Sequence, residues 1–152
     1  MRPAPLLLSL LLPLVLACGR PSTMEQFIKA EDAAASAVSP GGVYRFEVDF
    51  FDSLATYDIS LYTRLADTGA RNRVHGSEPL GLDVRWMSPA KETALEERVY
   101  IPYGGIRGVK ELYRSGVKPG SAGVWTIELR PVAENLLPIS GIGIICVCNG
   151  TR

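Results

Sequence analysis

His75, the single histidine of the chain, is the first residue to consider for catalysis, because histidine is the most frequent general acid or base in enzymes. Nucleophilic catalysis of the Ser-His-Asp type also requires a serine beside the imidazole and a carboxylate that orients it. His75 lies in the polar segment 73–77, which is typical of a solvated loop. A zinc site needs three or four ligands, and one histidine with two distant cysteines does not assemble them. The sequence therefore predicts an ordinary loop histidine.

Carboxylates are the second group that could carry acid-base or metal chemistry. Asp49, Asp52 and Asp58 lie close together in the sequence, as a calcium site or a glycosidase-type pair would require. Glu96 and Glu97 are adjacent, so on a strand they point to opposite faces and cannot act as a pair. All five occupy positions where solvent-facing carboxylates are expected. We therefore predict no catalytic residues, no metal ligands and no cofactor.

Cys146 and Cys148 are separated by one residue near the end of the chain. On an extended strand the two side chains point to the same face about 7 Å apart, so a bond between them would be strained. Buried free thiols that pack as small apolar groups are the favoured interpretation. A β-bulge could bring the sulfurs together, and an oxidising compartment would favour a disulfide, so this alternative stays open.

Exposed aromatic side chains could form a platform for a sugar or for another protein. Trp86 and Trp125 fall on apolar strand faces and are core candidates first. Tyr62 falls on a polar face, and Tyr100 is a second candidate for an exposed ring. We therefore predict Tyr62 and Tyr100 as contacts for a ligand or partner, while strand tyrosines are also common without one.

The first residues of the chain carry a targeting pattern. One positive charge, Arg2, precedes an apolar run from Leu6 to Ala17. About a dozen residues is shorter than the roughly 20 that span a bilayer, and it fits the apolar region of a secretory signal. The run ends in Val15-Leu16-Ala17-Cys18, which resembles the lipobox of bacterial lipoproteins. That resemblance implies cleavage before Cys18, with Val15, Leu16 and Ala17 as recognition residues, and lipidation of the Cys18 thiol.

Residues 1–17 are thus expected to be a lipoprotein signal peptide, and residues 18–42 a lipidated tether followed by an N-terminal arm. The segment 24–38 predicts a short helix or an extended arm, and the turn cluster 39–42 ends it. A lipid with two or three acyl chains would anchor the chain firmly, because each buried methylene contributes about 0.8 kcal/mol. An ordinary signal peptide with a chance cysteine is the alternative.

Residues 43–152 are predicted to form one all-β domain, an antiparallel β-sandwich of jelly-roll type. Its strand segments alternate apolar and polar residues, as in sheets with one buried face. These segments are 44–50, 57–62, 80–86, 95–103 and 124–132. The first two are predicted to form a hairpin. The segment 109–113 is expected to be a short edge strand, and 139–148, apolar on both faces, a central strand.

Charge excludes one class of partner. The chain carries 16 basic and 16 acidic residues, so its formal net charge is +0 at pH 7. Nucleic acid binding depends on a clustered cationic surface, and the sequence contains no such cluster. We therefore expect no nucleic acid partner.

The chain after Cys18 resembles the gliding-motility lipoprotein family GldH of Bacteroidota. The matching segments are the lipobox, 44–49, 57–64, 116–119, 123–129 and 139–144. The chain departs from the family over 66–79, where the family usually has an aromatic, asparagine-containing loop. It departs again at Tyr103-Gly104-Gly105, which replaces a segment of Trp-Leu-Gly type.

The resemblance implies a non-enzymatic accessory or scaffold component of an envelope assembly for gliding motility and linked secretion, with other envelope proteins as partners. Residues 19–23 contain no acidic residue, and surface-exposed lipoproteins of Bacteroidota often carry acidic residues there. We therefore expect an outer-membrane anchor that faces the periplasm. A glycan-binding module is the alternative function, and a hydrolase would need a pocket that gathers His75 with two carboxylates.

Overall fold

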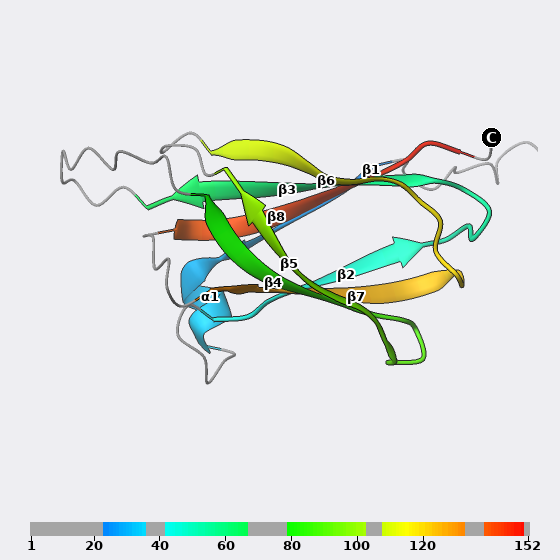
Figure 1. Ribbon diagram of the computed structural model, residues 1–152, viewed down its shortest axis with the longest axis horizontal. Coiled ribbons are helices and arrows are strands. Elements are labelled where there is room, and N and C mark those ends of the chain that lie inside the picture. Colours follow the sequence, from blue (N-terminus) through cyan, green and yellow to red (C-terminus); the bar gives the residue numbers. More distant parts are fainter. Residues whose placement is uncertain (1–22, 36–41, 67–78, 103–107, 133–138, 151–152) are drawn as a thin grey trace, which may run out of the picture.

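The computed structural model describes residues 23–35, 42–66, 79–102, 108–132 and 139–150 (Figure 1). Two four-stranded antiparallel sheets pack face to face, which confirms the predicted all-β sandwich. Sheet A has the strand order β1-β8-β3-β6, and sheet B has the order β2-β7-β4-β5. Two sheets of four strands in this order correspond to the jelly roll.

Each sheet combines strands from both halves of the chain. Sheet A consists of β1 (Thr23–Lys29), β8 (Ile139–Cys148), β3 (Tyr57–Leu65) and β6 (Val109–Val117). Sheet B consists of β2 (Tyr44–Phe50), β7 (Gly123–Pro131), β4 (Leu80–Met87) and β5 (Thr93–Ile101). A short helix, α1 (Ala30–Ala35), follows β1 directly.

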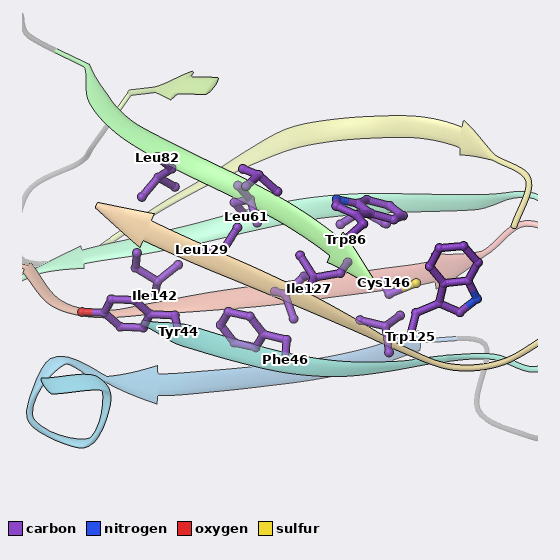
Figure 2. Packing of buried hydrophobic residues seen from close by; sticks show 14 of the residues in the cluster. Tyr44, Phe46, Leu61, Leu82, Trp86, Trp125, Ile127, Leu129, Ile142 and Cys146 are labelled. Carbon is purple, nitrogen blue, oxygen red and sulfur yellow. The ribbon is translucent and has the colours of Figure 1, made fainter. Parts of the chain in front are cut away.

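Alternating side chains place the core between the two sheets. In β2 every second residue is buried, and Tyr44 and Phe46 are fully so. They belong to one buried cluster with residues of sheet A such as Leu61 and Ile142 (Figure 2). Fully burying one such side chain contributes about 1.5–3 kcal/mol, so the shared core holds the two layers together.

The predicted hairpin between residues 44–50 and 57–62 is wrong. β2 pairs with β7, and β3 pairs with β8 and β6. The turn 51–56 instead carries the chain from sheet B to sheet A, so β2 and β3 lie in different layers. The rings of Phe50 and Tyr57 then meet edge to face across the core, with centroids 4.8 Å apart. Alternation shows that each strand has a buried face, but it does not show whether two strands pair or stack.

The predicted domain boundary also needs correction. β1 pairs with β8 over its whole length, from Thr23 with Val147 to Lys29 with Gly141, so the sandwich begins at Thr23 rather than at residue 43. The arm is therefore an edge strand followed by a helical turn, and Ala33 of that turn is buried. An edge strand buries little of its surface, which explains its weak apolar pattern. Residues 18–22 lie outside the described residues.

The last strand and the edge strand of sheet A agree with the sequence. β8 lies between β1 and β3, as its apolar pattern on both faces predicts. β6 is an edge strand, and it is longer than expected because it extends to Val117. The proposed strand residue Tyr103 lies outside the described part of the chain.

The end of the sandwich at which β1 begins, which we call the Thr23 end, is on the right in Figure 1. Thr23 pairs with Val147, and Val147 pairs with Asp58, so the first residues of β1 and β3 and the last residues of β8 meet there. The turns 51–56, 88–92 and 118–122 lie at the same end, because they follow β2, β4 and β6.

Candidate functional site

The outer face of sheet B carries many charged side chains, most of which pair with one another. Cross-strand register places Arg45, Glu128, Arg85 and Glu96 in one row over four strands. Arg45 Nη2 lies 2.7 Å from Glu128 Oε1, and Arg85 Nε lies 3.1 Å from Glu96 Oε1. The Glu128 carboxylate is buried, and it also accepts a hydrogen bond of 3.3 Å from Arg130. Opposite charges in directly paired positions stabilise a sheet.

A second row on the same face repeats the pattern. Asp83 of β4 pairs with Arg130 of β7 on one side and with Arg98 of β5 on the other. Arg98 donates two hydrogen bonds to the Asp83 carboxylate, at 2.6 and 3.1 Å. These hydrogen bonds hold the pKa of Asp83 below its usual value. With most of its charges paired within the sheet, this face fits a solvated surface.

The outer face of sheet A has the opposite character. One cross-strand row contains Phe27, Gly143, Tyr62 and Lys110, and the next contains Glu25, Ile145, Ser60 and Leu112. We call Phe27, Tyr62, Leu112 and Ile145 the apolar stripe. Phe27 is 45% exposed and Leu112 is 57% exposed, and Tyr62 and Ile145 lie between them in these two adjacent rows.

A groove of about 560 Å³ lies along part of the stripe. Its lining residues are Glu25, Gln26, Phe27, Tyr62, Lys110, Gly143 and Ile145. Gly143 forms the floor between the two rings, whose centroids are 6.0 Å apart at an interplanar angle of 65°. A Cβ at Gly143 would lie 2.9 Å from the backbone oxygen of Gln26 and 3.2 Å from the Phe27 ring. The glycine therefore allows the phenyl ring to lie close to the sheet.

The two predicted contact residues do not form one platform. Tyr62 lies on the outer face of sheet A, whereas Tyr100, 60% exposed, lies on sheet B. Trp86 points into the core and is 5% exposed, so it cannot extend either surface (Figure 2). Phe27, which sequence reasoning did not select, is the ring that accompanies Tyr62. The segment 23–29 contains too few apolar residues to indicate a strand, so the sequence offers no clear signal for it.

Four of the five carboxylates considered for chemistry have structural partners, and the fifth, Asp49, is exposed on β2. Asp52 accepts a 2.8 Å hydrogen bond from the Leu54 amide, and Asp58 accepts one of 2.8 Å from the Gly116 amide. Glu96 and Glu97 point to different faces, as predicted: Glu96 pairs with Arg85, and Glu97 contacts β6. In the described residues, no three histidine, cysteine, aspartate or glutamate side chains gather as a metal site. His75 lies outside them.

Both thiols near the end of β8 are free, but only Cys146 is buried as the favoured interpretation expects of both. Cys146 points into the core and is 5% exposed, and Cys148 is half-buried. Burial raises the pKa of the Cys146 thiol to about 12, with smaller contributions from Cys148 and Asp58. A buried thiol of this kind is chemically inert.

The predicted lipidation residue Cys18 and the recognition residues Val15, Leu16 and Ala17 lie outside the described residues. Among the helices that are described, none has the length and apolar character needed to cross a bilayer. Comparison with family models, with curated proteins and with solved structures found no match for this chain.

Proposed function

We propose that this chain is a lipid-anchored, non-enzymatic accessory protein of the bacterial envelope, which binds another envelope protein through the outer face of sheet A. The observation that carries the proposal is the contrast between the two outer faces of one sandwich. Sheet B presents mostly paired charges, and its exposed apolar side chains, Tyr100 and Val124, lie at opposite ends of the sheet. Sheet A instead gathers its exposed apolar side chains in two adjacent rows as the apolar stripe. An exposed apolar patch with a polar rim is characteristic of interaction sites on soluble domains.

The surroundings of the stripe resemble a protein interface more than a catalytic site. The rows nearer α1 contain three basic residues, Lys29, Arg64 and Lys110. The rows nearer the Thr23 end contain two acidic residues, Glu25 and Asp58. Protein interfaces commonly have an apolar centre enriched in aromatic residues and a polar rim. A partner with an apolar strip, acidic on one side and basic on the other, would match this arrangement.

The anchor and the cellular role come from the sequence. Cleavage before Cys18 and lipidation of its thiol would hold the sandwich at the outer membrane, facing the periplasm. The resemblance to the GldH family supports a role as a scaffold component of an assembly for gliding motility or linked secretion. A non-enzymatic role is consistent with the carboxylates of Asp52, Asp58 and Glu97, which are engaged in structural hydrogen bonds and an ion pair.

The test is recovery of partners from gently solubilised envelopes, with mass spectrometry to identify them. The stripe variant Phe27→Ser/Leu112→Ser is compared with the control Tyr100→Ser/Val124→Ser, which removes two exposed apolar side chains from sheet B. We expect wild-type protein and the control to recover the same partners and the stripe variant to lose them. Equal recovery by both variants would refute the assigned surface, and a Cys18→Ala variant that still partitions with membranes would refute the anchor.

A glycan-binding role is the second candidate, and the observation that favours it is the pair of Phe27 and Tyr62 beside the floor of Gly143. Aromatic rings on a sheet can pack against the apolar faces of sugars, and Glu25 and Lys110 offer polar contacts in the same groove. Leu112 is not part of the groove lining. Isothermal titration with envelope polysaccharide therefore separates the two roles: Phe27→Ala would abolish glycan binding while Leu112→Ser would leave it unchanged.

A further inference from the structure

The start of β1 fixes where a lipid tether would leave the domain. Thr23 lies beside Val147 on the neighbouring strand, and Val147 lies beside Asp58 on the next. Two strand spacings therefore separate Thr23 from Asp58, about 10 Å across the sheet. The turn 51–56 leads into β3 beside this point. Its backbone is tied to the last described residues: the Thr56 amide donates to the Gly150 oxygen at 3.1 Å, and the Asn149 amide donates to the Thr56 oxygen at 2.8 Å.

The tether is short compared with the domain. Four residues, Gly19 to Ser22, separate Cys18 from Thr23. Five Cα-to-Cα steps span at most about 18 Å. The strands of seven to ten residues are about 23–33 Å long. A lipid on Cys18 would therefore keep the Thr23 end near the membrane and would not allow the opposite end to face it.

The turn 51–56 presents an apolar side chain at this end. Leu54 is 76% exposed, the highest value among the exposed large apolar residues of the described chain. Its position is fixed by its neighbours. The Asp52 carboxylate accepts the Leu54 amide hydrogen at 2.8 Å, the Tyr57 hydroxyl bonds to both backbone groups of Asp52 at 3.0 Å, and Ala55 is buried. A turn held this firmly keeps the leucine pointed outward.

The neighbouring turns add small apolar and basic groups. Pro89 and Ala90 are exposed in the turn between β4 and β5, and Lys91 follows them in a left-handed conformation with φ of 62°. The Lys91 amide donates to the Ser88 oxygen at 2.8 Å, which closes this turn. Lys118 is exposed in the turn between β6 and β7. Glu92 is the acidic residue of these two turns.

We infer that the Thr23 end is a membrane-contact surface, in which Leu54 enters the headgroup region of the lipid layer that holds the Cys18 anchor. The inference rests on the proposed lipid anchor. Apolar side chains bind at the boundary between headgroups and acyl chains, and lysines beside them can reach lipid phosphates. The anchor makes this contact intramolecular, so a single leucine suffices to bias the orientation. The upright domain then presents the apolar stripe sideways, toward proteins in the same layer.

The test uses the full lipidated chain in vesicles of phosphatidylethanolamine and phosphatidylglycerol. A fluorophore sensitive to polarity is attached at Leu54→Cys and, as controls, at Leu112→Cys and Tyr100→Cys, one on each sheet face. These three side chains are exposed, so their replacement leaves the core intact. The parent protein, labelled in parallel, corrects for Cys146 and Cys148. Flotation and intact mass report the anchor independently of the fluorescence.

We expect the label at residue 54 to shift to the blue and to be quenched several-fold more strongly by nitroxide lipids than the labels at 100 and 112. A floating, acylated protein whose label at 54 remains in water overturns the inference and leaves the anchor intact. Quenching at 112 instead shows that sheet A lies on the membrane, which overturns both the orientation and the partner surface. Loss of flotation overturns the anchor and this inference together.

Discussion

The hydroxyl of Tyr113 donates a hydrogen bond to the carboxylate of Glu97, and this contact joins the edge strand β6 of sheet A to the edge strand β5 of sheet B. Arg114 Nη2 reaches the same carboxylate oxygen at 2.7 Å, and Trp86 Nε1 donates to the Tyr113 hydroxyl at 3.2 Å. The group links a core residue to both edges. Removing the Tyr113 hydroxyl leaves Trp86 Nε1 without its acceptor and takes one donor from Glu97, which keeps Arg114 as its partner.

The variant Tyr113→Phe tests the energetic role of this group. It removes the donor to Glu97 and the acceptor for Trp86, so we expect the free energy of unfolding to fall by about 1–3 kcal/mol. The measurement is denaturant-induced unfolding followed by fluorescence. Asp83→Asn is the matched control, because Asp83 and Arg98 form an ion pair whose side chains are 48% and 49% exposed. Such pairs contribute about 0–1 kcal/mol, so a control that costs as much as Tyr113→Phe would contradict the assignment.

The same carboxylate predicts a dependence of stability on pH. Burial opposes ionisation of Glu97, but hydrogen bonds from Tyr113 and Arg114 and the charge of Arg114 outweigh it, so its pKa lies below the ordinary 4.5. A carboxyl group whose pKa is lower in the folded than in the unfolded state stabilises the fold at pH values above its unfolded-state pKa. This stabilisation is lost as the pH falls through the folded-state pKa. We expect stability to fall below about pH 4.5 and the fall to be shallower in Glu97→Gln. Identical pH profiles for the two proteins would refute this role.

The strands and the buried positions were largely predictable, because an alternating pattern has a period that only an extended chain can satisfy. That pattern places Trp86 and Trp125 on apolar strand faces, and both are buried. The pairing of strands was not predictable in the same way, because Phe50 and Tyr57 would be apolar in either a hairpin or a stacked arrangement. Register across sheets depends on contacts between distant segments, which local sequence does not record.

The candidate site was only half predictable for a related reason. Tyr62 was identified because it interrupts a polar face, but Phe27 lies on an edge strand whose apolar content is too low to show it as a strand. The glycines of β8 that receive the Phe27 ring looked like ordinary members of an apolar run. Their role depends on the pairing of β1 with β8, which brings Phe27 opposite Gly143.

Tyr44 provides a prediction of increased stability. Its side chain is fully buried, and its hydroxyl has no hydrogen-bond partner among the described residues. Burial raises its pKa to about 12. A buried hydroxyl without a partner costs about 1–3 kcal/mol, so we expect Tyr44→Phe to raise the free energy of unfolding by about 1 kcal/mol. Thermal unfolding at neutral pH measures it, and a lower melting temperature than wild type would show that the hydroxyl has a partner.

Gly141 tests the close approach of β1 to β8. A Cβ at this position would overlap the backbone oxygen of Ile28 and the ring of Phe27. We expect Gly141→Ala to lower the free energy of unfolding by about 1–3 kcal/mol, because the edge strand must move. Gly120→Ala is the control, since no described atom lies within 4 Å of its added Cβ, and a change within about 0.5 kcal/mol is expected. Equal effects of the two substitutions in chemical denaturation would contradict the pairing.

The thiols of β8 test the burial of its inner face. Cys146 points into the core with a pKa raised to about 12 by burial, whereas Cys148 is half-buried at the strand end. The thiolate is the reactive form, so alkylation of the native protein near pH 8 should modify Cys148 and leave Cys146 unmodified until the fold is denatured. Peptide mass spectrometry after a timed reaction with iodoacetamide separates the two sites. Modification of both thiols at the same rate would show that β8 opens. A disulfide bond between Cys146 and Cys148 under non-reducing conditions would show that the strand is bulged at Val147.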